Sequence, residues 1–175
     1  STPPSRFYTL SPTATAGATT SNLSVVVGPV SIPALVDLPQ IVVSAGPNQV
    51  SIDEFNRWAS PLTNNISRVV AANLVLLLGT PRVSQFQQSL NADADFRVAI
   101  EVQSFESAPG EAATLNAAWL VRRTRDGRAE TGRTTVREPA SDKGYDALAA
   151  AHSRALGRMS QDIADAVRTL GRAAP

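Results

Sequence analysis

One amphipathic helix limits what this 175-residue chain can fold into. Apolar side chains recur at three- and four-residue steps between residues 62 and 78, which places a wide apolar stripe on one helical face. Ser60 and Pro61 suit the N-cap and the first helical position, and Gly79 suits the left-handed residue that ends a helix. A stripe of this width has to be covered, so the chain needs a second layer packed on this helix. The stripe contains Leu62, Ile66, Val69, Val70, Asn73, Leu74 and Leu77.

A second long helix is predicted over about residues 145–170, where apolar side chains again form a stripe that includes His152. Period-two alternation predicts strands from Phe96 and from Leu115, and residues 129–136 form a polar return strand, as at a sheet edge. Asp126-Gly127 favours a type I′ hairpin turn between the last two strands.

The first half of the chain is predicted to contain shorter strands. One covers residues 23–30, and two arms at 40–44 and 49–52 form a hairpin. Asp53 is predicted to cap a short turn that carries Phe55 and Trp58. A further short strand is predicted at residues 82–86.

These elements predict an α/β protein with a mixed, largely antiparallel sheet and two long helices packed against it. Residues 1–22 are rich in Ser, Thr, Pro, Ala and Gly and are predicted to form a flexible tether with a strand-like island at Phe7–Leu10. Residues 23–175 are predicted to form a single globular domain.

Composition excludes several function classes. A net charge of +1 does not favour nucleic acid as a partner. The absence of cysteine from this sequence excludes a disulfide framework, a thiolate zinc site and a cysteine nucleophile within it. The most apolar run, Val69–Leu78, is too short to span a bilayer, which needs about 20 apolar residues.

Candidate chemical groups are few. The single histidine, His152, lies on an apolar helical stripe without a nucleophile motif, so we interpret it as structural. Asp93 and Asp95 are acidic neighbours that can bind a divalent cation, but the Gly and downstream Glu of a calcium loop are missing. Asp162 and Asp165 are interpreted as part of a solvated helical face. No catalytic, cofactor-binding or metal-binding residue is therefore predicted.

Four arginines gather at one hairpin end: Arg122, Arg123, Arg125 and Arg128. They are compatible with an anion or lipid-headgroup site. Asp126 and Glu130 partly neutralise them, so we favour an exposed turn.

Arg57 and Trp58 are the candidate interface residues. They precede the first long helix, and both residue types are enriched in binding hot spots. A Trp beside Phe55 and Leu62 is more often a buried core residue. We therefore predict that Trp58 is structural, and that Arg57 is partly exposed and contributes to assembly.

Several segments, taken in order, resemble the PqiC-type family of ABC-type transport auxiliary lipoproteins of Gram-negative bacteria. The resemblance covers nearly the whole chain, although its second half matches by layout more than by motif. The matching segments are Phe7–Leu10, Val25–Pro33, Leu38–Val42, Asn48 and Phe55–Leu62.

The resemblance implies a fold akin to the N-terminal domain of TolB and a location in the periplasm. Family members are anchored to the outer membrane through a lipidated N-terminal cysteine, and they act with MCE-domain proteins in lipid transport between the two membranes. That cysteine is absent from this sequence, and Ser1–Pro4 look like the residues that follow it.

The resemblance thus implies a non-enzymatic lipoprotein subunit that acts through protein contacts, with an MCE-domain protein as partner and a homo-oligomer as a possible state. The alternatives are a periplasmic lipid- or ligand-binding shuttle and, less favoured because nucleophile–base motifs are missing, a hydrolase. An adaptor of this size uses its apolar residues in its own core, so no lipid-sized internal pocket is expected.

Overall fold

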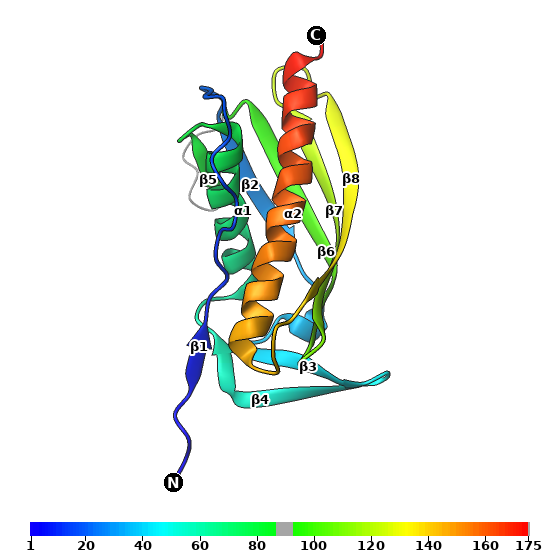
Figure 1. Ribbon diagram of the computed structural model, residues 1–175. Coiled ribbons are helices and arrows are strands. Elements are labelled where there is room, and N and C mark those ends of the chain that lie inside the picture. The colour runs from blue at the N-terminus through cyan, green and yellow to red at the C-terminus, as the bar shows by residue number, and fades with distance from the viewer. Residues whose placement is uncertain (87–92, 175) are drawn as a thin grey trace.

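The computed structural model describes residues 1–86 and 93–174, which form two sheets and two long helices (Figure 1). This confirms the predicted mixed α/β fold. The larger sheet has the order β5–β2–β6–β7–β8, formed by β5 (Val83–Gln85), β2 (Val25–Ser31), β6 (Phe96–Ala108), β7 (Ala112–Arg123) and β8 (Ala129–Pro139). The smaller sheet has the order β1–β4–β3, formed by β1 (Arg6–Tyr8), β4 (Gln49–Trp58) and β3 (Gln40–Gly46). The helices are α1 (Leu62–Leu78), α2 (Tyr145–Arg172) and the short 3-10 helix η1 (Ala34–Val36).

Both long helices pack on one face of the larger sheet (Figure 1). α1 packs on β2 and β5, α2 packs on β7 and β8, and the two helices contact each other. β2 runs parallel to β5 and β6, whereas β6, β7 and β8 form an antiparallel meander. Alternate residues of β6 are buried under the helices, as the period-two pattern predicts. β8 is an edge strand, also as expected.

The smaller sheet lies at one end of the body. Its β3–β4 hairpin projects away from the larger sheet (Figure 1). The ring centroid of Tyr8 in β1 lies 6.0 Å from that of Tyr145, the first residue of α2. We call this the hairpin end: it comprises β1, η1, the β3–β4 hairpin and the first turn of α2. The C-terminal end, with the last turn of α2 and the β7–β8 turn, lies opposite (Figure 1).

Strand β4 corrects one prediction. The backbone does not leave the strand after Asp53 but continues to Trp58, because residues 56–58 pair in parallel with β1. Asp53 still accepts a hydrogen bond from the backbone N–H of Phe55, at a register shift between β3 and β4. The predicted turn is therefore an irregularity within one long strand.

The N-cap prediction for α1 is wrong by one residue. Pro61 has an extended backbone (φ −50°, ψ 135°) and is the N-cap, and its carbonyl accepts the N–H of Asn65 at 3.0 Å. Ser60 lies outside the cap position, and no side chain caps this helix. At the other end Gly79 adopts the predicted left-handed conformation, with φ 64°.

The turn type between β7 and β8 is also wrong. A type I′ turn needs positive φ at both central residues, but only Gly127 has it here, with φ 74°. The N–H of Arg123 donates to the carbonyl of Arg128, and the N–H of Gly127 donates back to the carbonyl of Arg123, each at 2.8 Å. This is the pattern of a G1 bulge, which closes a longer hairpin loop.

The N-terminal segment between β1 and β2, residues 9–22, runs along α1 and contacts both long helices (Figure 1). We call it the strap. The side-chain oxygen of Asn73 accepts the N–H groups of Thr13 and Ala14, both at 3.1 Å, and Ser153 accepts the N–H of Ser11 at 3.0 Å. Gly17 donates to the carbonyl of Leu76 in α1. The flexibility of residues 1–22 stays a prediction.

Candidate interaction site

Trp58 ends β4 and is buried, with 6% of its surface exposed. Its ring packs edge-on against Phe105 of β6, with ring centroids 6.2 Å apart. Its backbone N–H donates to the carbonyl of Pro39 at 2.8 Å. The side chain joins the smaller sheet to the larger one, so a partner cannot reach most of its surface.

Arg57 lies in the middle strand of the smaller sheet, in register with Phe7 on one side and Gln40 on the other. Its side chain is half-buried, and its Nε donates to the carbonyl of Glu54 at 2.8 Å. This bond folds the guanidinium back along its own strand. The assembly role of Arg57, and of Trp58 as its neighbour, stays a prediction.

A polar cluster next to these residues joins three elements. The carboxylate of Asp53 accepts hydrogen bonds from the N–H of Phe55 at 2.8 Å and from the amide of Asn56 at 2.7 Å, and these bonds lower its pKa. The hydroxyl of Tyr8 donates to Asn56, and that of Tyr145 lies 3.5 Å from Asp53. Burial, followed by the negative charge of Asp53, raises the pKa of Tyr145. The cluster therefore ties β1 and α2 to β4.

His152 is fully buried in α2 and stacks on Phe105, with ring centroids 3.7 Å apart. Desolvation lowers the pKa of His152 to about 3, so its ring is neutral near pH 7. Its Nε2 lies 2.8 Å from the hydroxyl oxygen of Ser107, which is itself 3% exposed. Because both groups are enclosed in the core, this hydroxyl–imidazole pair has no surface on which a substrate can bind.

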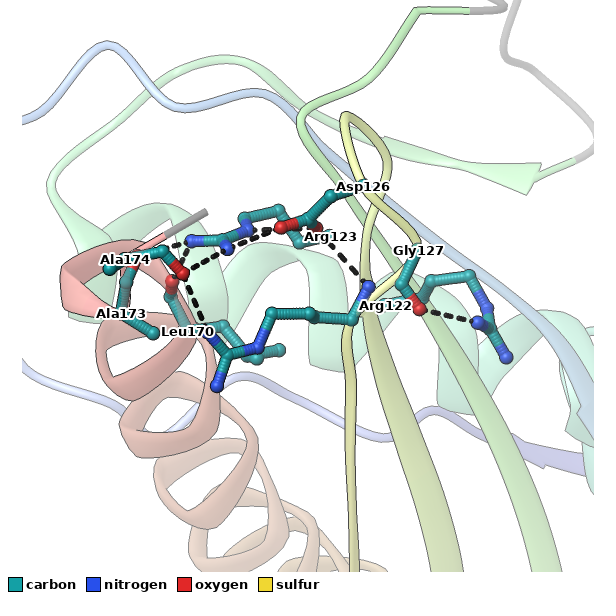
Figure 2. A network of polar contacts seen from close by, with 8 residues as sticks. Arg122, Arg123, Asp126, Gly127, Leu170, Ala173 and Ala174 are labelled. Carbon is teal, nitrogen blue, oxygen red and sulfur yellow. Dashed lines mark hydrogen bonds and ion pairs between the residues drawn. The ribbon is translucent and has the colours of Figure 1, made fainter.

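The prediction of an exposed turn is wrong for Arg123, because this side chain is buried, with 3% of its surface exposed. Figure 2 shows its guanidinium between Asp126 and the carbonyl oxygens of the last turn of α2. Nη1 donates to Leu170 at 2.6 Å and to Ala173 at 2.7 Å, while Nε and Nη2 bind the two carboxylate oxygens of Asp126. This arginine therefore caps the C-terminus of α2, and its donors are used within the protein and do not form a site for an external anion.

The sequence does contain a signal for this burial. The alternation Leu115, Ala117, Trp119, Val121 continues to position 123, so Arg123 has the inward parity while Arg122 has the outward one. The hydrogen bonds from Arg123 lower the pKa of Asp126 to about 2, which keeps the pair ionised over most of the pH range. Arg128 adds a bond to the carbonyl of Ala174.

Three of the four acidic residues that the sequence presents as pairs have structural partners. Asp95 accepts the N–H of Ser24 at 2.9 Å, and the hydroxyl of Ser24 accepts the N–H of Asp95 at the same distance. Asp162 accepts the hydroxyl of Thr134, and Asp165 pairs with Arg168 at 3.1 Å. Within residues 1–86 and 93–174, no group of three or more His, Cys, Asp or Glu side chains is arranged to hold a metal ion.

Sequence reasoning missed the polar residues that hold the strap. Asn65 and Asn73 of α1 are completely buried, and Asn73 also donates to Ser160 of α2 at 3.1 Å. Asn73 lies inside the most apolar run of the chain. A polar residue at such a position is the one sequence signal for a buried hydrogen-bonding role here. The donors it binds lie about sixty residues away, in a segment without apolar periodicity.

The family model for the ABC-type transport auxiliary lipoprotein component matches residues 8–164. The chain belongs to this family. The match includes the strap, the candidate residues Arg57 and Trp58, and most of α2.

Two crystal structures share the fold. One is a Xanthomonas campestris protein of the family model DUF330, with a TM-score of 0.78 and 21% identity over 95% of this chain and 97% of the other. The second, an uncharacterized protein, has a TM-score of 0.77 and 21% identity over 94% and 99% of the two chains. The search of curated proteins gave no match. At this identity the two structures establish the fold alone, and the likeness to TolB stays a prediction.

Proposed function

We propose that this protein is a non-enzymatic subunit of an MCE-type intermembrane lipid transport system and acts through protein contacts. The observation that carries the proposal is the family match over residues 8–164, which makes the chain a transport auxiliary lipoprotein component. The enclosed Ser107–His152 pair supports a role without catalysis, because a reacting group needs access to substrate.

The proposed location is the periplasm, on the outer membrane. In this proposal a lipidated cysteine precedes residue 1 and anchors the chain, and the folded domain binds an MCE-domain protein and, in a homo-oligomer, other copies. No helix in the described parts of the chain is long and apolar enough to cross a membrane.

The distribution of cavities favours an adaptor over a lipid shuttle. A depression of about 720 Å³ lies on the sheet face away from the helices and is open to solvent; Ala99, Ala118, Leu120 and Arg133 are among its lining residues. An open surface of this kind cannot enclose most of a lipid, as a carrier must. Between the sheet and the helices, side chains such as Val98, Leu115 and Leu156 are fully buried and form a packed core.

The test is purification of the full-length lipidated protein from membranes, with bound proteins and bound lipids both identified by mass spectrometry. Co-purification of an MCE-domain protein without stoichiometric lipid is the expected result. Stoichiometric phospholipid on the isolated protein supports the shuttle instead, and the absence of any MCE-domain protein contradicts the adaptor proposal.

A further inference from the structure

The strap determines the end of the body at which the N-terminus leaves. β2 begins at the C-terminal end, because Val25 pairs with Phe96, Phe96 pairs with Arg123, and Arg123 binds the last turn of α2. The strap runs back from there to β1 at the hairpin end (Figure 1). The 28 residues of α2 separate the two ends by about 42 Å. Without the strap in place, the N-terminal chain would leave from the opposite end.

The strap is held mainly by its backbone. From Ser11 to Asn22 all residues are exposed except Ala14 and Ser21, which are half-buried, whereas Leu10 is 1% exposed and fills an apolar socket. A Cβ atom on Gly157 of α2 would lie 2.2 Å from the hydroxyl oxygen of Thr13, so this glycine makes room for the strap. The surface of α1 and α2 under the strap, which we call the groove and which includes Asn73, Ser153 and Gly157, thus positions one segment of chain.

The hairpin end also carries exposed apolar side chains. Phe7 is 64% exposed, Leu35 55%, Val50 42% and Ile52 49%. They come from β1, η1 and β4, and these elements are spread across the end of the body from which the N-terminus leaves (Figure 1). Several large apolar side chains left exposed at one end of a domain point to a contact surface.

The balance of charged side chains at the hairpin end limits the kinds of surface that this end can bind. In β1, in residues 34–58 and in residues 141–146, acidic side chains outnumber basic ones. The acidic ones are Asp37, Asp53, Glu54, Asp142 and Asp146, and the basic ones are Arg6, Arg57 and Lys143. This balance gives no attraction to anionic headgroups, so contact with a membrane here depends on the apolar side chains.

We propose that the hairpin end is a membrane-facing surface, which rests its exposed apolar side chains on a lipid bilayer while the strap holds the anchored N-terminus at that end. The inference rests on the lipid anchor of the proposed function. Residues 1–5 precede β1, so with the strap docked the chain that leads to the anchor leaves from the end that carries Val50 and Ile52. The C-terminal end then faces away from the membrane, toward a partner.

The experiment places single cysteines at Ser51 and at Arg125 of the full-length lipidated protein, bound to phosphatidylcholine vesicles that contain brominated lipid. Both positions are exposed, the first on the hairpin and the second in the β7–β8 turn. We expect a fluorophore at Ser51 to be quenched several-fold more than one at Arg125. Equal quenching, or stronger quenching at Arg125, overturns the proposal.

Flotation of the same vesicles separates the two proposals. Protein that fails to float contradicts the lipid anchor, and with it the proposed function. Protein that floats but shows the wrong pattern of quenching contradicts only the membrane-facing surface.

Two variants test the parts of the proposal. Val50→Ser/Ile52→Ser changes exposed side chains and is expected to float normally but to lose most quenching at Ser51. Leu10→Asp/Gly157→Leu fills the groove and puts a charge in the Leu10 socket, so the strap is released; quenching at Ser51 and Arg125 should then become similar. Unchanged quenching in the first variant overturns the apolar contact, and unchanged quenching in the second overturns the role of the strap.

Discussion

The two terminal regions of the chain are held on the long helices by different kinds of contact. At the C-terminal end the buried guanidinium of Arg123 binds a carboxylate and the carbonyls of the last helical turn (Figure 2). Along the strap that leads to the hairpin end, neutral Asn73 and Ser153 accept backbone N–H groups. The first attachment includes an ion pair and closes the C-terminus of α2. The hydrogen bonds of the strap involve no carboxylate among the described residues, although Arg68 donates to the carbonyl of Leu10 at 2.8 Å. The strap in turn donates from Gly17 and Ser21 to carbonyls in the last turn of α1.

This difference indicates which attachment can be released. Removing Arg123 would take one donor away from the carbonyl oxygens of Leu170 and Ala173 at the end of α2. Removing the strap exposes Asn65, Asn73, Ser153 and Ser160, which water can solvate. Nδ2 of Asn65 is buried without a hydrogen-bond partner among the described residues, so solvation would satisfy it. Among the strap residues, only Leu10 would lose a large buried apolar surface on release.

The largest expected effect concerns the support of the hairpin end. Trp58→Ala removes a buried aromatic side chain that packs on Phe105, so we expect the free energy of unfolding to fall by about 3–5 kcal/mol. Chemical denaturation of the variant and the parent protein measures this loss. A loss below about 1 kcal/mol would show that Trp58 does not carry the contact between the two sheets.

Arg57→Ala is the matched control, because Arg57 is the neighbouring residue and is half-buried. We expect nearly parental stability together with weaker association with the partner protein or with other copies. Normal association, or a loss of stability as large as that of Trp58→Ala, contradicts the assembly role of Arg57.

The second expected effect is a pH dependence that arises in the core. His152 has a folded-state pKa of about 3, against an ordinary 6.5, so the unfolded chain binds its proton first as pH falls. Its contribution to stability is complete above about pH 6.5 and is lost down to about pH 3, with a loss near 2 kcal/mol at pH 5. Denaturation at pH 7 and pH 5 measures it. His152→Phe keeps a ring against Phe105 and should remove most of this loss; an unchanged pH dependence would contradict the assignment to His152.

The third prediction decides between the flexible tether and the docked strap. A tether exchanges its amide hydrogens at nearly the intrinsic rate, whereas the hydrogen bonds to Asn73 slow exchange at Thr13 and Ala14. We expect slowed exchange at both amides, and Asn73→Ala, which removes both acceptor bonds, should cost the docked segment about 1–3 kcal/mol. Hydrogen exchange resolved by NMR checks this, with Ala18 as the internal reference for an exposed position. Fast exchange at Thr13 and Ala14 in the parent protein would favour the tether.

How far the sequence predicts this molecule differs between its parts. The stripes of α1 and α2 and the alternation in β6 predict the main elements, because burial on one face repeats at a fixed period. The strap shows no period, since backbone amides hold it and the acceptors come from distant helices. The length of β4 was missed for a related reason: its last residues stay extended because they pair with β1, which lies some fifty residues earlier.

The smallest expected effect tests the ion pair between Arg123 and Asp126 at the C-terminal end. The hydrogen bonds from Arg123 lower the folded-state pKa of Asp126 to about 2, below its ordinary value of 3.8. The stabilisation from this carboxylate is therefore fully present above about pH 4 and is lost as pH falls from about 4 to 2. Asp126→Asn should have a shallower loss of stability in that window, while the loss between pH 6.5 and 4.5, which we assign to His152, stays parental.

The strap attachment contains no titrating acceptor. The rate of amide hydrogen exchange in the strap, after correction for the intrinsic rate, should therefore show no step between pH 4 and 2 while the fold persists. Denaturation curves at closely spaced pH values, with hydrogen exchange at Thr13 measured beside them, separate the two attachments. If Asp126→Asn keeps the parental loss below pH 4, the ion pair with Arg123 does not stabilise the C-terminal end, and the contrast between an ion-paired attachment and a strap held without a carboxylate is wrong for the ion-paired attachment.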